Sequence, residues 1–392
     1  MASKWCKDLD LKSELDEALQ IAKQDLGQRV GAPRPPGLSR YLAHPRTISG
    51  IAPAKKWTGG VRTDEDCVAI FVPRKLGAGG KGRWPGRRED EIPRSIKLES
   101  GREVVTDVIE ARFHALSPHG AQGMAVPQGA VRRGFVSPAQ PGCSISGATT
   151  DGRLTAGTLG AFLQDRGGAK YILSCNHVLA LEDPNNLTGA IHQPGQADCP
   201  GNDPMAAGVL AVPLIGNQAA TQAGAPAAAQ GGPQAGAPAV GQAWNKVDAA
   251  IAEVRGRAVD PGFVQVDGYS PSKPQSPDPL SPEEGMKVFK VGRTTGYTEG
   301  VIHAAASTPT AVDEYAQGTL LFERQAIITV TEGFSRFADD GDSGSLVVSC
   351  VAPYRPVGML IGASRYYAVA SWFSVVLEEL KREFNKELML VI

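Results

Sequence analysis

Ser343 lies in the run Gly341-Asp342-Ser343-Gly344-Ser345, which strand-like residues follow directly. Glycines beside a polar residue allow a tight turn and a close approach of a ligand to the backbone. In such a turn the amides of Gly341 and Ser343 can point at one spot, where fixed donors stabilise developing negative charge on an oxygen. The run therefore predicts a nucleophilic hydroxyl beside an oxyanion hole formed by Gly341 and Ser343. A polar turn between two strands is the alternative for these five residues taken alone.

His177 is a second candidate, because it follows the strand-like run 170–173 and a short polar step. Imidazole titrates nearest to neutral pH, which suits a general base. A histidine between apolar neighbours is also often a hydrogen-bonded core residue, and that alternative stays open for His177 alone. The remaining histidines lack matching flanks: His44, His114, His119, His192 and His303.

Asp248 stands inside the otherwise apolar run 247–252. A carboxylate is costly to bury unless a group hydrogen-bonds to it. An imidazole N–H is a natural partner, and the bond fixes the tautomer that a general base needs. The alternative is a surface acid beside Lys246.

The order His177, Asp248, Ser343, with spacings of 71 and 95 residues and the flanks described above, resembles the trypsin-like serine peptidases of the chymotrypsin fold. The resemblance implies an intracellular serine endopeptidase that hydrolyses peptide bonds through a Ser-His-Asp catalytic triad and an acyl-enzyme. The alternative is a catalytically silent or latent protease-fold protein that acts as a partner-binding module.

Further segments resemble a bacterial branch related to the plant Narrow-leaf type of protease. These segments are 106–110, 156–160, Gln193–Gly195 with Asp198, and 290–296. Ser345 departs from the pattern, since many trypsin-like enzymes have a second glycine there. In the family, a freed N-terminal amine pairs with the aspartate before the nucleophile. The long stretch of chain ahead of the expected barrels argues against that pairing for Asp342. We therefore expect another donor to hold Asp342, or Asp342 to remain a latent switch.

The resemblance also places the primary specificity pocket between the residues before Gly341 and the strand 358–364. The expected lining is Phe337, Ala338, Asp340, Ile361, Gly362 and Ala363. Phe337, in place of a basal acid, favours small or medium apolar side chains in the substrate. Two other preferences stay open, because Asp339 or Asp340 could select a cation and Arg365 could favour an acid.

Short strand-like runs between Gly, Pro, Asp and Ser clusters recur from about residue 125 and predict a mainly β fold. The resemblance implies two six-stranded antiparallel barrels of chymotrypsin type within a peptidase domain. That domain is expected at 123–392, with barrels at about 123–258 and 259–370 and a C-terminal helix at 371–388. The Ala/Gly/Pro/Gln-rich segment 215–243 is expected to be a mobile insertion.

Residues 1–122 are expected to form a small α/β domain to which no role is assigned. Helical spacing predicts an amphipathic helix over 8–26, and apolar runs predict strands at 67–72 and 104–109. An activating partner that acts through this domain is a further expectation.

Composition narrows the class of protein. The 392 residues have a formal net charge of -1, so no global attraction for nucleic acid or an anionic membrane is expected. The start shows no export signal, and the six cysteines lack paired spacing, which predicts reduced thiols and a cytoplasmic location. The loop Gly77–Gly82 lacks the spacing of a phosphate-binding loop, and no zinc-ligand spacing occurs. We therefore expect no cofactor, no metal, and a protein or peptide as substrate.

Overall fold

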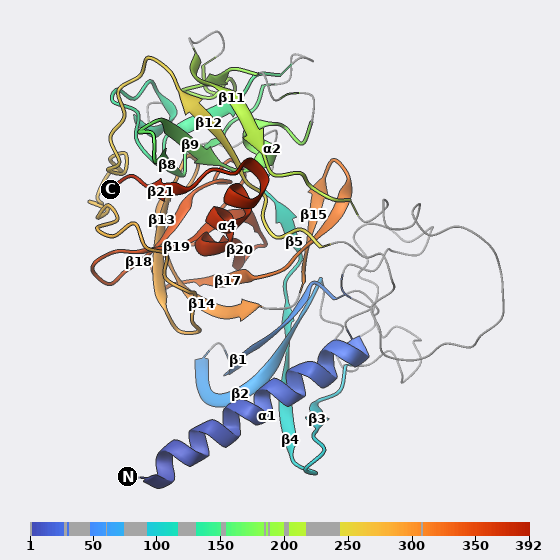
Figure 1. Ribbon diagram of the computed structural model, residues 1–392. Coiled ribbons are helices and arrows are strands. Elements are labelled where there is room, and N and C mark those ends of the chain that lie inside the picture. The colour runs from blue at the N-terminus through green and yellow to red at the C-terminus, as the bar shows by residue number, and fades with distance from the viewer. Residues whose placement is uncertain are drawn as a thin grey trace, which may run out of the picture.

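Three β-sheets make up most of the described chain, which confirms the mainly β fold expected from the sequence (Figure 1). The computed structural model describes residues 2–26, 30, 48–59, 61–73, 92–116, 131–149, 154–183, 186, 189–199, 204–216, 244–306 and 309–392, and for residues 2–12 only the backbone of the helix. Most of the insertion expected at 215–243 lies outside these residues.

The first sheet belongs to the N-terminal part of the chain and has the strand order β1-β2-β4-β3. Its strands are β1 (Gly50–Thr58), β2 (Val61–Val72), β3 (Ser95–Lys97) and β4 (Glu103–Glu110), and β2 and β4 run parallel. Helix α1 (Ala2–Leu26) lies across this sheet and packs Ala18, Leu19 and Ala22 into one apolar cluster with Ile51 and Ile70 (Figure 1). The helix and the two strands predicted here fall within α1, β2 and β4.

The second sheet is curled and is formed by strands within residues 144–254 together with the C-terminal residues 388–390. Its order is β21-β8-β9-β12-β11-β10-β6-β7. The strands are β6 (Ser144–Gly147), β7 (Gly157–Thr158), β8 (Ala161–Asp165), β9 (Lys170–Ser174), β10 (Ile191–His192), β11 (Pro204–Ala211), β12 (Ala250–Val254) and β21 (Leu388–Leu390). Between β7 and β8, the Leu159 amide donates to Cys143 O and the Gly160 amide donates to Leu173 O, both at 2.9 Å. The chain thus passes from one edge of the curled sheet to the other.

The third sheet contains a closed barrel, because β19 pairs with both β18 and β20 in the order β19-β18-β13-β14-β17-β20. These strands are β13 (Lys287–Gly292), β14 (Gly296–Ala306), β17 (Gln325–Val330), β18 (Leu346–Ser349), β19 (Pro356–Ala363) and β20 (Tyr367–Trp372). The hairpin of β15 (Thr310–Tyr315) and β16 (Gly318–Phe322) extends the sheet.

Strand β5 (Phe113–Ala115) joins this third sheet, although it directly follows the N-terminal sheet in the chain. It runs parallel to β15 and antiparallel to β19, and Figure 1 shows it alongside β15. A short segment near residue 115 is therefore built into the sheet that carries residues 310–363.

The C-terminal helix is shorter than the predicted 371–388. Helix α4 covers Phe373–Phe384, because Ser371 and Trp372 complete β20 and Asn385 adopts the left-handed conformation (φ 51) that ends a helix. Leu388–Leu390 then forms β21, which pairs with β8 and buries Leu388 and Leu390. No helix among the described residues has the length and apolar character needed to cross a membrane.

Candidate active site

The pairing of β9 with β12 brings His177 and Asp248 together. The two strands are antiparallel, and Ser174 at the end of β9 faces Ala250 at the start of β12. Residues just after Ser174 and just before Ala250 therefore emerge at the same end of the ladder. His177 lies there on the short helix α2 (Asn176–Leu179). The side-chain amide Nδ2 of Asn176 donates to the carbonyl of Val212 at 2.8 Å and ties the helix to that residue.

The predicted triad residues lie within hydrogen-bonding reach of one another. Nε2 of His177 lies 2.7 Å from Oγ of Ser343, and Nδ1 of His177 bonds to Oδ2 of Asp248. The backbone amide of His177 also donates to Oδ1 of Asp248 at 3.3 Å. The exposed fraction is 2% for His177 and 0% for Asp248 and Ser343.

Tyr315 is a further contact of the acid that sequence reasoning missed. Its hydroxyl donates to Oδ2 of Asp248 at 2.8 Å. Burial raises the pKa of Asp248, but the charge of His177 and the hydrogen bonds from His177 and Tyr315 outweigh burial and hold that pKa below its ordinary value. Burial likewise lowers the pKa of His177, but Asp248 outweighs it and raises that pKa above its ordinary value. The pair therefore favours a charged carboxylate.

The turn that carries Ser343 is held by contacts with both barrel sheets. The amide of Gly344 donates to the carbonyl of Leu360 at 2.9 Å, within the closed barrel. From the curled sheet, the amide of Thr158 donates to the carbonyl of Ser343 at 3.0 Å, and Oγ1 of Thr158 donates to the carbonyl of Gly341 at 2.8 Å. Thr158 thus connects the turn of Ser343 to the sheet that carries His177.

Gly344 cannot be replaced without displacing its neighbours. Its φ is +88°, and a Cβ at this position would lie 2.1 Å from Oγ of Ser174 and 2.7 Å from the carbonyl oxygen of Thr158. A glycine after Ser343 is therefore required both by backbone conformation and by space.

Asp342 is buried and held by internal donors. The amides of Thr294 and Thr295 donate to Oδ1 at 2.8 and 3.1 Å. Oγ1 of Thr295 donates to Oδ2 at 2.6 Å, and Nζ of Lys290 donates to Oδ2 at 3.3 Å. Lys290, Thr294 and Thr295 therefore donate to the Asp342 carboxylate, for which the sequence predicted a donor other than a freed N-terminal amine.

Asp198 and Arg293 join the segments singled out around 193–198 and 290–296. Nη2 and Nε of Arg293 lie 2.5 and 2.8 Å from the Asp198 carboxylate, and Oγ of Ser144 donates to Asp198 at 2.5 Å. Burial raises the pKa of Asp198, but Arg293 and the hydrogen bonds outweigh it and lower that pKa. Because the backbone amide of Arg293 also donates to Oγ1 of Thr158 at 2.9 Å, this ion pair supports the turn of Ser343.

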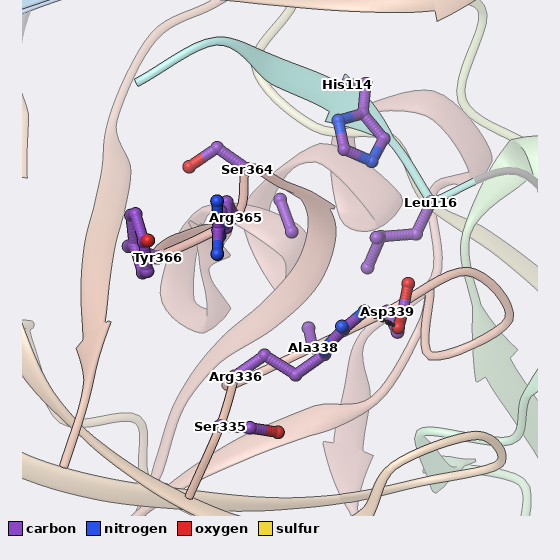
Figure 2. A pocket seen from close by; sticks show the side chains of 10 residues that line it. His114, Leu116, Ser335, Arg336, Ala338, Asp339, Ser364, Arg365 and Tyr366 are labelled. Atoms are coloured by element: carbon purple, nitrogen blue, oxygen red, sulfur yellow. Dashed lines mark hydrogen bonds and ion pairs between the residues drawn. The ribbon is translucent and has the colours of Figure 1, made fainter. Parts of the chain in front are cut away.

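A cavity of about 540 Å³ opens beside the triad, and Figure 2 shows the side chains around it. Its lining is His114, Leu116, Ser335, Arg336, Ala338, Asp339, Ala363, Ser364, Arg365 and Tyr366. Of the residues expected to line a substrate pocket, Ala338 and Ala363 line this cavity. Sequence reasoning did not single out His114, Leu116, Ser335 or Arg336.

The other residues expected in the pocket lie beside it. Phe337 is 2% exposed and belongs to the apolar cluster of the closed barrel. The carbonyl of Asp340 accepts a hydrogen bond from Oγ1 of Thr294 at 2.6 Å. Ile361 and Gly362 lie on β19, where Gly362 pairs with Ala115 and the carbonyl of Ile361 accepts from the Leu116 amide at 3.4 Å.

The cations of this cavity differ in their partners. Arg336 forms an ion pair with Asp339, so its charge is compensated. The guanidinium of Arg365 lies over the ring of Tyr366, 5.0 Å from its centroid. The pairing of Arg336 with Asp339 therefore argues against a cation preference, and the acid preference that Arg365 could supply stays open.

Cys175, His177 and Asp248 place possible metal-ligand atoms within 4.8 Å of one another. Burial raises the pKa of the Cys175 thiol well above its ordinary value, and its Sγ donates to the carbonyl of Leu360 at 3.3 Å. A thiol must lose its proton to bind a metal ion. Since His177 and Asp248 also bond to each other, this group fits a hydrogen-bonded triad better than a metal site.

No protein-family model and no curated protein matches this chain. Among solved structures, it is similar to a glutamic acid specific serine protease described as using a histidine triad in substrate binding, with 17% identity over 64% of this chain and 100% of that chain and a TM-score of 0.39. It is also similar to Thermobifida fusca protease A, with 14% identity over 64% of this chain and 99% of that chain and a TM-score of 0.37. A Nocardiopsis protease is similar with 13% identity over 65% of this chain and 100% of that chain, also with a TM-score of 0.37. The chain has the chymotrypsin type of fold, because a curled sheet carrying His177 and Asp248 and a closed barrel carrying Ser343 meet at these three residues.

Proposed function

We propose that the protein is a serine endopeptidase with Ser343 as nucleophile, His177 as general base and Asp248 as the acid that orients the base. The observation that carries the proposal is the chain of contacts from Ser343 through His177 to Asp248, with 2.7 Å between the hydroxyl oxygen and the imidazole nitrogen. A hydroxyl, an imidazole and a buried carboxylate in this order are the parts of nucleophilic acyl transfer.

In this mechanism, His177 accepts the Ser343 proton as Oγ attacks the peptide carbonyl, and Asp248 stabilises the imidazolium that forms. The amides of Gly341 and Ser343 serve as the oxyanion hole. In support, neither amide donates a hydrogen bond to another group of the described chain, whereas the Asp342 amide between them donates to the carbonyl of Asp339 at 2.9 Å. Two amides without acceptors in one tight turn suit a transient negative charge.

Hydrolysis of added peptides by the Ser343→Ala variant tests this function. We expect kcat to fall by at least about 10³-fold, because loss of a triad nucleophile removes covalent catalysis. The melting temperature should change little. Ser349→Ala is a matched control, since the Ser349 hydroxyl donates to the carbonyl of Val351 at 3.0 Å, outside the triad. Undiminished hydrolysis by Ser343→Ala would contradict the assignment.

A second candidate function is the latent form of the alternative, a protease-fold protein that binds partners. The burial of Ser343, with an exposed fraction of 0%, favours it, because an outside substrate reaches this hydroxyl only when the segment that covers it moves away. A chain that hydrolyses peptides without any added protein partner would contradict this second candidate.

The cytoplasmic location and the relation to the plant Narrow-leaf type branch belong to the proposal as well. Their support is the sequence motifs and the absence of disulfides among the described cysteines, which are Cys67, Cys143, Cys175, Cys199 and Cys350.

A further inference from the structure

Strand β5 occupies the edge of β19 that borders the triad. Ala115 faces Gly362 and His114 faces Ala363 in an antiparallel ladder, and the Leu116 amide donates to the carbonyl of Ile361 at 3.4 Å. An extended segment that adds to an exposed sheet edge is a general mode of peptide binding, in which the backbone supplies affinity and pockets select side chains. Phe113–Leu116 lies on β19 as a bound peptide would.

Leu116 reaches into the cavity beside the nucleophile. Figure 2 shows its side chain pointing toward the space bordered by Ala338 and Arg365. Its exposed fraction is 0%, and it belongs to the same apolar cluster as Phe337, Ala338 and Ala363. The leucine side chain of the segment that pairs with β19 thus forms part of the wall of this cavity.

The carbonyl of Leu116 lies at the nucleophile. Its oxygen is 2.8 Å from Oγ of Ser343, which in turn is 2.7 Å from Nε2 of His177. The single hydroxyl proton can be donated to only one of these two partners at a time. A peptide carbonyl of the chain itself therefore lies within hydrogen-bonding reach of the hydroxyl proposed as nucleophile.

We propose that Phe113–Leu116 is an internal substrate and that the protein cleaves its own peptide bond on the carboxyl side of Leu116. This inference rests on the proposed endopeptidase function and names its first substrate. It also assigns a leucine side chain to the primary pocket, in agreement with the apolar preference expected from Phe337.

The reaction is a hydrolysis with water as co-reactant. Oγ of Ser343 bonds to the carbonyl carbon of Leu116, whose oxygen turns toward the amides of Gly341 and Ser343. His177 accepts the hydroxyl proton and passes it to the leaving nitrogen as the carbon–nitrogen bond breaks. Water then attacks the ester, His177 takes one water proton and returns it to Oγ, and Leu116 is left as a terminal carboxylate.

Other contacts hold the segment in the cleft before and after cleavage. Nε of Arg112, just ahead of β5, bonds to Oδ2 of Asp313 on β15 at 2.7 Å. Arg62 on β2 makes a bidentate pair with Glu284 at 2.7 and 2.6 Å. Because these contacts do not depend on the bond after Leu116, the cleaved N-terminal part stays bound and continues to cover Ser343.

The test follows the full-length chain by intact-mass spectrometry and N-terminal sequencing of the products. Wild-type protein should yield one fragment that ends at Leu116 and one that begins at residue 117, whereas Ser343→Ala should stay intact. The reaction should be first order, with a rate constant unchanged on about 100-fold dilution, because enzyme and substrate are one molecule.

Leu116→Ala and Leu98→Ala form a matched pair, since both remove a buried leucine from the N-terminal part and only Leu116 lies in the cleft. We expect Leu116→Ala to cleave itself at least about 10-fold more slowly, since the pocket loses its apolar contact. The same variant should react faster with a fluorophosphonate, since the segment covers Ser343 less tightly. Leu98→Ala should resemble wild type in both measurements.

The outcomes separate the inference from the proposed function. If wild type stays intact, or is cut at another bond, while Leu116→Ala reacts with the fluorophosphonate and hydrolyses added peptide, self-cleavage is wrong and the endopeptidase function stands. Cleavage of Ser343→Ala after Leu116 would also overturn self-cleavage, because another protease would then be responsible. If no form reacts with the fluorophosphonate or hydrolyses peptide, the proposed function itself fails.

Discussion

Nζ of Lys290 lies 3.3 Å from Oδ2 of Asp342, and both side chains have an exposed fraction of 0%. Lys290 also donates to the carbonyl of Gly296 at 3.0 Å, so the ammonium group is satisfied within the barrel. Since Asp342 lies between the two candidate oxyanion amides, this ion pair holds the conformation of the turn. The cation belongs to β13, so the turn needs no newly formed chain terminus to hold it.

Replacing Lys290 with methionine should therefore lower both stability and activity. Removing one partner of a buried ion pair leaves an uncompensated charge and costs about 3–5 kcal/mol in the free energy of unfolding. We also expect kcat to fall by roughly 10²-fold, as for loss of an oxyanion donor, because the Asp342 turn is no longer fixed. Thermal unfolding and peptide hydrolysis measure the two effects. Lys287→Met, on an exposed position of the same strand, is the control and should change neither.

Tyr315 is expected to act as a positioning residue for Asp248. A hydrogen bond to a charged group contributes about 1.5–3 kcal/mol, and Tyr315→Phe removes the one at 2.8 Å. We expect kcat to fall about 10-fold with little change in KM, because the hydroxyl contacts the acid and not the substrate. Tyr297→Phe provides the comparison, since that hydroxyl donates to Glu299 at 2.6 Å and should leave kcat unchanged. A matching loss of kcat in both variants would rule out a specific role for Tyr315.

The pH dependence of peptide hydrolysis should show the raised pKa of His177. Burial lowers this pKa, but the charge of Asp248 outweighs burial, so the value lies above the ordinary 6.5. The base must be neutral to accept the Ser343 proton. Activity should therefore rise with pH, with the midpoint of its acid limb above 6.5. An acid limb centred below 6.5 would contradict the environment described for His177.

His303 should make stability depend on pH at the contact between the N-terminal sheet and the closed barrel. Its ring lies 5.4 Å from Trp57, 6.0 Å from Phe71 and 5.4 Å from Tyr367, and its nitrogens have no hydrogen-bond partner in the described chain. Burial lowers the pKa of His303 from 6.5 to about 4, although Asp107 and Glu284 act in the opposite direction. The folded state thus disfavours the proton that the unfolded state accepts.

For this depressed pKa, the contribution to stability is full above pH 6.5 and is lost as the pH falls toward 4. The loss amounts to about 3 kcal/mol. His303→Phe keeps the aromatic contacts and removes the titrating group, so its melting temperature should vary less between pH 6.5 and 4. An unchanged slope in that variant would show that other groups cause the acid sensitivity.

The candidate triad could be predicted from sequence because each member lies in a local pattern with a chemical meaning. A glycine-flanked serine, a histidine at a strand end and an aspartate in an apolar run are visible without any tertiary structure. The pairing of β9 with β12 brings His177 beside Asp248, and the hydrogen bonds of Thr158 join the turn of Ser343 to the sheet that carries them.

Lys290 left a weaker signal. A charged residue within the apolar run 288–291 indicates a buried cation, yet nothing local names Asp342 as its partner, 52 residues away. Tyr315 is similar, because an aromatic residue in a strand is more often a packing residue than a hydrogen-bond donor to an acid. Pairing between distant residues decides both roles.

The position of Phe113–Leu116 could not be predicted, because the strand is short and its partners lie about 200 and 250 residues further along the chain. Periodicity describes one segment at a time and carries no information on which sheet edge that segment will join. The end of α4 at Asn385 was missed for a different reason. The apolar spacing of residues 373–384 continues into Leu388, where it serves a strand and not a helix.

The attachment of β5 to the same molecule also determines what an outside peptide must overcome. A tethered ligand is present at an effective concentration in the millimolar range, whatever the protein concentration. A soluble substrate competes with Phe113–Leu116 for β19 through its own concentration and its affinity for that strand. If their combined effect is weaker than the binding of the tethered segment, the substrate cannot displace Phe113–Leu116. Under the proposed endopeptidase function, we therefore expect turnover of other proteins to be limited by how often β5 detaches, and KM to report that detachment together with binding.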